Sequence, residues 1–201
     1  MRSARQGVDA LREALSREGG TVAAMLVPAP PERPRLAEPG PAQVAAAGPR
    51  AAGREREYEL LLEMILEGYR LHYEEPSLVR AGDPDLALLL GDQLYALGLA
   101  RLAELGDLDA VAELADVISL AAQAHSGSDA ELAGAVWEAG AVAVGWGASD
   151  AHRRAKARAR AHEPGAPAAL RSAAAELRNG SLSRSPQAQA DLKPPAKSQG
   201  L

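Results

Sequence analysis

The chain has 201 residues, no cysteine, no phenylalanine and a net charge of −5 at pH 7. The absence of cysteine excludes disulfide bonds, thiolate zinc sites and cysteine nucleophiles. Charge is unevenly distributed: residues 1–54 have a net charge of +3, residues 55–150 of −15 and residues 151–201 of +7. We interpret the acidic middle as solvated outer faces of helices, with a surface for a cation or a basic partner as the alternative.

Residues 1–53 form the first predicted region, which we expect to be a largely disordered flank with one short helix. Val8, Leu11 and Leu15 are spaced as on one face of a helix over residues 7–18. Residues 28–53 are rich in proline, glycine and alanine, a composition typical of extended or disordered linkers. We therefore expect the chain to stay folded when residues 1–50 are removed.

An acidic α-helical core domain is predicted for residues 54–148, beginning with an amphipathic helix. Its apolar residues share one face, which comprises Tyr58, Leu61, Leu62, Ile65, Leu66, Tyr69 and Tyr73. Glu63 and Glu67 lie beside this face, where we expect solvent exposure. The sequence Glu-Glu-Pro at residues 74–76 predicts the end of the helix, because a residue before proline avoids helical geometry.

Residues 83–107 predict the central helix of the core. Asp83 can cap the first turn, Pro84 suits the first helical position, and Gly106 ends the helix. Leucines occur on every side, and a helix that is apolar all round is normally enclosed by other helices. Asp92 is the one acidic residue deep inside this segment, so we expect it to face a hydrogen-bonding partner, a helix end or water.

Two further helices complete a predicted all-α bundle of about four core helices with disordered flanks. The third covers residues 108–124, and the fourth covers residues 129–146, with Ser128 and Glu131 as a capping box. The fourth helix has many small residues, which allow close backbone approach within the chain or to a partner helix. The candidate interface residues are Leu99, Ala135, Ala139 and Trp146.

We predict no transmembrane segment and no secretory signal. Residues 132–148 approach the length of a membrane span, but Glu138 lies near their middle and much of the segment is alanine and glycine. Residues 1–20 are polar and charged, unlike a signal peptide. We therefore expect a cytoplasmic protein.

Residues 149–201 predict a basic helix-prone segment, a weak helix near residues 167–178 and a disordered tail. The basic side chains of the first segment are Arg153, Arg154, Lys156, Arg158 and Arg160. They could contact nucleic acid or anionic lipid, but no aromatic residues are interleaved with them. We favour a solubilising role or contact with the acidic core, and we expect no nucleic-acid partner. His152, in the same segment, is expected to be solvated.

No complete catalytic motif occurs in the chain, and no motif predicts a bound cofactor. Glu63 and Glu67 are four residues apart and could hold a hard cation, and Asp92 is a third weak candidate for a metal ligand. We interpret all three as structural, because helices commonly carry exposed glutamates and a buried aspartate needs a hydrogen bond. His72 and His125 have no second ligand at metal-binding spacing, which favours packing or capping roles.

One pair of predicted helices carries a family resemblance. Its residues are Gly-Asp-Gln-Leu-Tyr at 91–95, Leu-Ala-Glu-Leu-Gly-Asp at 102–107, and then Leu114, Ala115 and Ile118. This pattern resembles a segment of the trans-prenyl diphosphate synthases. It is more similar still to the small component of two-component heptaprenyl diphosphate synthases, over residues 58–124. That family joins a catalytic subunit to a related subunit without the catalytic motifs, and makes the side chain of menaquinone.

Active synthases hold magnesium and the allylic diphosphate with two aspartate-rich motifs that this chain lacks. Where the family has the first of these motifs, residues 60–69 of this chain are Leu-Leu-Leu-Glu-Met-Ile-Leu-Glu-Gly-Tyr. This stretch contains Glu63 and Glu67 but no aspartate pair. Residues 73–76 are Tyr-Glu-Glu-Pro where the family has basic residues, and glutamates repel a diphosphate. The resemblance therefore implies a chain that does not catalyse prenyl transfer alone.

Our leading hypothesis is a non-catalytic accessory subunit that packs on a catalytic polyprenyl diphosphate synthase and helps to shape its product cavity. The first alternative is a helical protein–protein interaction module unrelated to prenyl metabolism. The second is a free-standing enzyme that uses Glu63, Glu67 and Asp92. The first two hypotheses predict a helical protein partner or a homo-oligomer.

Overall fold

The structure is a computed structural model that describes residues 4–28 and 39–182. Within these residues the fold is all-α, as predicted, with nine α-helices and one short 3-10 helix, η1. The extended pairing in this part of the chain is one isolated antiparallel bridge between Leu26 and Val79. The helices are α1 (Ala4–Glu18), α2 (Gly20–Ala24), α3 (Pro41–Ala46), η1 (Pro49–Ala51), α4 (Glu55–Tyr73), α5 (Pro84–Glu104), α6 (Leu108–Ser126), α7 (Ala130–Trp146), α8 (Asp150–Arg160) and α9 (Ala166–Leu182).

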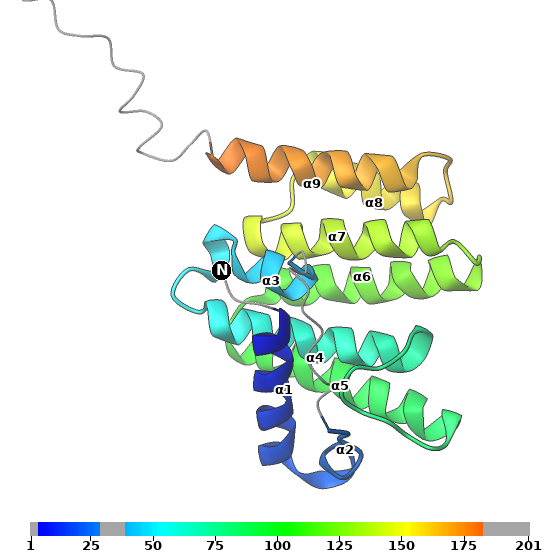
Figure 1. Cartoon of the computed structure of the whole chain (residues 1–201). Coiled ribbons are helices and arrows are strands. Elements are labelled where there is room, and N and C mark those ends of the chain that lie inside the picture. The colour runs from blue at the N-terminus through cyan, green and yellow to red at the C-terminus, as the bar shows by residue number, and fades with distance from the viewer. Residues whose placement is uncertain (1–3, 29–38, 183–201) are drawn as a thin grey trace, which may run out of the picture.

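Three pairs of helices are stacked as layers (Figure 1). α4 packs with α5, α6 packs with α7, and α8 packs with α9. α3 joins two layers because it contacts both α4 and α7, and α1 runs across α4. The bundle is therefore larger than the predicted four helices, since α3, α8 and α9 also contribute to its main apolar core.

The helix starts follow the residue types in the sequence. The Asp83 side chain accepts hydrogen bonds from the backbone N–H groups of Asp85 and Leu86, as predicted. The fourth predicted helix begins one residue later than the expected capping box. Asp129, rather than Ser128, accepts from the Leu132 N–H, while Ser128 has a φ of 55° and lies in the preceding turn.

The most enclosed helix is α7, so the prediction that residues 83–107 form the central element is wrong. Most residues of α7 are buried, whereas α5 buries only a narrow face. Glycines let α7 approach its neighbours closely. A Cβ atom on Gly140 would lie 2.2 Å from Val117 Cγ2, and one on Gly145 would lie 2.5 Å from the Ala45 carbonyl oxygen.

The region predicted as a flank also belongs to the folded core. α3 lies within the expected linker, and its Ala42 and Ala45 are fully buried against α4 and α7. Short alanine side chains allow this close contact. A helix of six residues is too short to show a clear apolar period, so the sequence pattern did not predict it. This packing argues against the expectation that residues 1–50 are dispensable, because their removal would uncover apolar surface of α4 and α7. Residues 29–38 and 183–201, which include most of the predicted tail, lie outside the described residues.

The basic segment also contributes to the core rather than following it. Ala155 and Ala159 of α8 and Leu170 of α9 are buried in the same apolar cluster as α6 and α7. A second, smaller cluster lies between α1, α2, α4 and α5. It contains Leu11, Leu15, Val22, Met64, Leu71, Leu78, Val79, Leu90 and Leu94.

Substitution of Gly145 by alanine tests the backbone contact between α7 and α3. The new Cβ atom has no room beside the Ala45 carbonyl, so we expect Gly145→Ala to destabilise the protein by about 1–3 kcal/mol. Gly134→Ala in the same helix is the matched control, because its Cβ has space, and it should stabilise by about 0.5–1 kcal/mol. Urea denaturation of both variants measures the difference. Equal stability of Gly145→Ala and the unsubstituted protein would show that this contact is not close.

Candidate functional sites and surfaces

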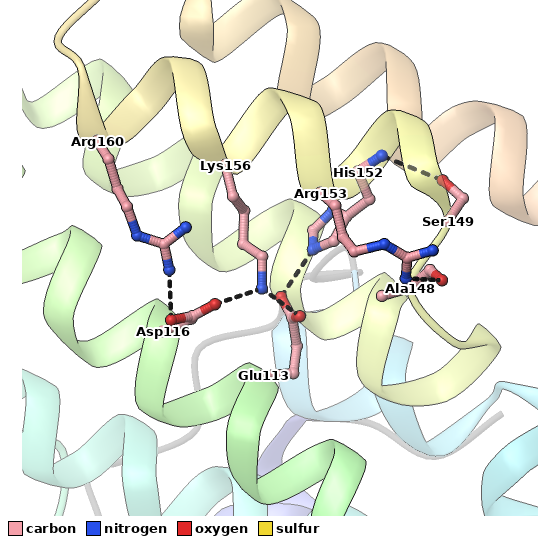
Figure 2. A network of polar contacts seen from close by, with 8 residues as sticks. All are labelled: Glu113, Asp116, Ala148, Ser149, His152, Arg153, Lys156 and Arg160. Carbon is pink, nitrogen blue, oxygen red and sulfur yellow. Dashed lines mark hydrogen bonds and ion pairs between the residues drawn. The ribbon is translucent and has the colours of Figure 1, made fainter.

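A buried ionic network joins α6 to α8 (Figure 2). Glu113 of α6 accepts hydrogen bonds from His152 Nε2 at 2.7 Å and from Lys156 Nζ at 2.6 Å. Lys156 also donates to Asp116 at 2.7 Å, and Arg160 donates to the other oxygen of the Asp116 carboxylate. The network therefore connects two carboxylates one turn apart on α6 with three basic side chains spaced four residues apart on α8.

The inner part of this network is shielded from water. The side chains of Glu113, His152 and Lys156 are all at least nine-tenths buried. Burial alone would raise the pKa of Glu113, but hydrogen bonds and positive charge from His152 and Lys156 outweigh it, so the pKa of this carboxyl is lowered from its ordinary value. Glu113 is thus ionised at neutral pH and only accepts hydrogen bonds, so His152 Nε2 is the donor.

The network gives the basic segment a structural role. Lys156 and Arg160 pair with the acidic face of α6, and Arg158 pairs with Glu163 beyond α8. Contact with the acidic core, one of the favoured interpretations, is therefore observed. The expected solvation of His152 is wrong, because the ring is fully buried. Sequence reasoning missed Glu113 and His152 because neither lies in a motif; their only signal is their position on the inner faces of two helices.

A second set of buried carboxylates follows one face of α4. Glu59, Glu63 and Glu67 are each less than 5% exposed, so the expected solvent exposure of Glu63 and Glu67 is wrong. Glu67 accepts hydrogen bonds from the backbone N–H groups of Ser77, Leu78 and Val79, and from Arg70. Its oxygens are thereby committed to holding the loop that follows α4.

Glu63 and Glu59 are covered by α3 and α1. The amide of Gln43 donates to Glu59 Oε1 at 3.1 Å and to Glu63 Oε1 at 3.0 Å. Gly7 of α1 lies directly above, since a Cβ atom there would be 2.9 Å from Glu59 Oε1. Burial raises the pKa of Glu63, although Gln43 and Arg70 oppose this shift. A cation site over these glutamates would require α1 to move.

Asp92 does not join the other two weak metal candidates. It lies on α5 with a 70% exposed side chain, so it faces water, as expected. Its Oδ1 lies 3.2 Å from His72 Nε2. Among the described residues, no group of three or more histidine and acidic side chains is arranged to hold a metal ion.

An aromatic cluster packs around the end of α4. Tyr69 Oη and His125 Nε2 are 2.8 Å apart, and the Tyr73 ring stacks on His125 with 4.3 Å between centroids. His72 stacks on Tyr95 of α5 with 5.3 Å between centroids. The predicted packing roles of both histidines agree with these contacts, which connect α4 to α5 and α6.

The outer face of α5 is apolar and exposed. We define this outer face as Leu88, Leu89, Asp92, Gln93, Ala96, Leu99, Ala100 and Ala103, which lie on one side of the helix. Leu89 is 65% exposed and Leu88 is 44% exposed. Leu108, at the start of α6, is 66% exposed. These are three of the four large apolar side chains that are exposed in the described residues.

The four predicted interface residues differ in their exposure to solvent. Leu99 lies on the outer face of α5 and is partly buried. Ala135 and Ala139 are fully buried within the chain, in the contacts of α7, and are not available to a partner in this fold. Trp146, at the end of α7, is partly buried and packs on the main core.

α5 is also the one helix among residues 4–28 and 39–182 that is long and apolar enough to cross a membrane. Length and composition alone do not assign a membrane span, and α5 is anchored to α4 by close contacts at Gly91 and Gly98. The segment at residues 132–148 that was weighed as a span is largely α7, which is buried.

Comparison of the chain with models of protein families, with curated proteins and with solved structures gives no match.

Lys156 tests whether the buried network depends on charge balance. We expect Lys156→Met to destabilise the protein by about 3–5 kcal/mol, because it leaves Glu113 and Asp116 without their shared cation. The double variant Glu113→Gln, Lys156→Met should recover part of this loss, since it also removes the buried negative charge. Arg154→Met on the exposed side of α8 is the control and should change stability by less than about 0.5 kcal/mol. A double variant less stable than Lys156→Met would contradict this account.

The pH dependence of stability tests the ionised state of Glu113. A group with a lowered pKa in the folded state stabilises the fold above its unfolded pKa, and this contribution is lost as pH falls through the folded pKa. Unsubstituted protein should therefore lose stability below pH 4.5, the ordinary value for glutamate. Glu113→Gln should show a shallower loss over the same range. Urea titrations between neutral and acidic pH measure both slopes, and identical slopes would exclude a lowered pKa.

Proposed function

We propose that this chain is a non-catalytic accessory subunit that binds a catalytic polyprenyl diphosphate synthase through the outer face of α5. The observation that carries the proposal is the exposure of this leucine-rich helix, with Leu89 65% exposed. Contiguous exposed apolar surface on a water-soluble domain commonly marks a protein interface. The resemblance of residues 58–124 to the small component of heptaprenyl diphosphate synthases supports the choice of partner.

The polar clusters support a non-catalytic role. Glu67 is hydrogen-bonded to three backbone N–H groups, and Gln43 and Gly7 cover Glu63. Glu113 is paired on both oxygens. These carboxylates stabilise the fold. Asp92 lies on the outer face of α5, where it can form a polar contact with the partner.

Charge around the outer face of α5 favours a partner of different sequence over a second copy. Asp85, Asp92 and Glu104 of α5 are acidic and exposed. Two copies meeting through this face would bring these carboxylates together, and like charges across an interface weaken association. A partner helix with leucine or alanine at its centre and basic residues at its rim would complement both features.

The same surface would serve the alternative function, a helical interaction module unrelated to prenyl metabolism. The two functions differ in what binding does to catalysis. An accessory subunit changes the activity or product length of the synthase, whereas an unrelated module leaves both unchanged.

Ala96→Glu on the outer face of α5 tests the proposal. The full chain would be mixed with the catalytic polyprenyl diphosphate synthase of the same organism, and affinity would be measured by titration calorimetry. We expect binding by the unsubstituted chain and at least about tenfold weaker binding by Ala96→Glu, because the new charge is desolvated in an apolar contact. Ala168→Glu on α9 is the matched control, since this alanine is also helical and exposed, and it should bind normally.

The product assay accompanies the titration. Elongation of a labelled allylic diphosphate should be absent with this chain alone and altered in product length when it is added to the synthase. Absence of binding by the unsubstituted chain, or equal binding by Ala96→Glu, would contradict the docking proposal. Binding without any effect on the products would favour the unrelated interaction module.

A further inference from the structure

The N-terminal arm, which we define as α1, α2 and residues 25–27, packs on its own apolar cluster. Leu11, Leu15 and Val22 of the arm contact the cluster that includes Met64 of α4 and Leu90 of α5. The main core, by contrast, contains none of the side chains of α1 and α2 that the structure describes. Detachment of the arm would therefore uncover the smaller cluster and leave the contacts of α6, α7, α8 and α9 in place.

The arm is attached at its far end by a small number of polar contacts. Val27 N–H donates to the Leu78 carbonyl at 2.8 Å, and Arg80 N–H donates to the Met25 carbonyl at 3.0 Å. Arg101 of α5 forms an ion pair with Glu18 at the end of α1. Between α1 and α2, Gly19 and Gly20 have φ values of 76° and 69°, with open space where a Cβ would lie. These glycines form the sharp turn that brings α2 against α1, so the two helices can move together.

The closed arm buries a carboxylate oxygen that lacks a hydrogen bond. Glu63 Oε2 is inaccessible to water and has no hydrogen-bond partner among the described residues. Arg70 Nη1 is 3.7 Å from this oxygen and lies closer to Glu67, at 3.3 Å. An unsatisfied buried polar group is destabilising, and water would solvate this oxygen if α1 moved away. Opening therefore recovers part of the free energy lost by uncovering the apolar cluster.

The arm also contacts the helix that presents the docking surface. Leu90 and Leu94, which the arm helps to bury, lie on the side of α5 opposite Leu89 and Ala96. With the arm closed, α5 packs on α4 and meets the arm through the ion pair between Arg101 and Glu18 and through the shared apolar cluster. With the arm open, α5 keeps its contacts with α4 at Gly91 and Gly98 but loses its second support.

We propose that the N-terminal arm opens and closes as a unit on α4 and α5, and that its closure holds α5 in the position that binds the partner. The second half of this proposal rests on the proposed function, whereas the opening of the arm is a property of the free chain. A partner that binds only the closed state has an apparent affinity reduced in proportion to the fraction that is open.

Two substitutions shift the arm in opposite directions. Gly7→Leu places a side chain where even a Cβ atom would meet Glu59 and Gln43, and so it favours opening. Leucine also has a higher helix propensity than glycine. Any faster hydrogen exchange in α1 of this variant therefore comes from the collision and not from a weaker helix. Glu63→Gln removes the buried negative charge and favours closure. Ser16→Leu, at an exposed position of α1, is the matched control.

Hydrogen exchange of the full-length free chain measures the opening. We expect α1 and α2 to exchange together, faster than α6 and α7. Glu63→Gln should slow exchange in the arm by about tenfold, and Gly7→Leu should accelerate it by at least about tenfold. Exchange in α6 and α7 should stay the same in every variant, which separates arm opening from global unfolding. Ser16→Leu should match the unsubstituted chain.

Equal exchange rates in the arm and in α6 and α7 would overturn the opening of the arm as a unit. Faster exchange in Glu63→Gln, or unchanged exchange in Gly7→Leu, would do the same. Titration of the catalytic synthase with Gly7→Leu tests the coupling, with an expected loss of affinity of at least about tenfold. Unchanged affinity would refute the coupling alone, and no binding by the unsubstituted chain would refute the proposed function while the exchange results stand.

Discussion

Close backbone contact along α7 is the constraint on which the rest of the fold depends. α7 packs against α3, α6, α8, α9 and η1, so elements from the two ends of the chain meet on one helix. At Gly140 and Gly145 the neighbouring atoms leave no room for a Cβ atom. Interiors packed at this density respond to a single added methyl group. Alanine and glycine in α7 are therefore what allow three layers of helices to form one core.

Carboxylates buried in the acidic middle need hydrogen-bond donors, and distant segments of the chain supply them. Gln43 of α3 reaches Glu59 and Glu63, and Lys156 of α8 reaches Glu113. These contacts join segments that differ by 16 to 43 positions in sequence. Removing either segment would leave an unpaired buried charge, which costs far more than the loss of an exposed ion pair. We therefore expect α3 and α8 to belong to the same cooperative unit as α4 and α6.

Sequence patterns predicted the helices well and their burial poorly. The limits of α4, α5 and α6 follow from Asp83, Asp107, Pro76 and the apolar spacing, because these signals act within a few residues. Leucine content suggested that α5 is central and α7 is secondary, whereas the reverse is observed. The distance at which helices pack depends on side-chain size, so a glycine-rich helix can be the most enclosed. The burial of Glu63 and Glu67 depends on Gln43, Gly7 and the loop amides at 77–79, and no local pattern reveals such distant partners.

The different placement of small and large apolar side chains is also relevant to function. Alanines and glycines of α7 lie at the centre of the fold. In the described part of the chain three leucines remain exposed, two on α5 and one at the start of α6. Glu67 and Glu113 are deeply buried and bonded to donors from the chain itself, so forming a ligand site there would first require breaking contacts that hold the fold. The outer face of α5 carries no such cost, because its leucines are in water and lose only hydration when a partner covers them. This difference supports the proposed action through protein contact at the outer face of α5, rather than through a ligand site among the buried carboxylates.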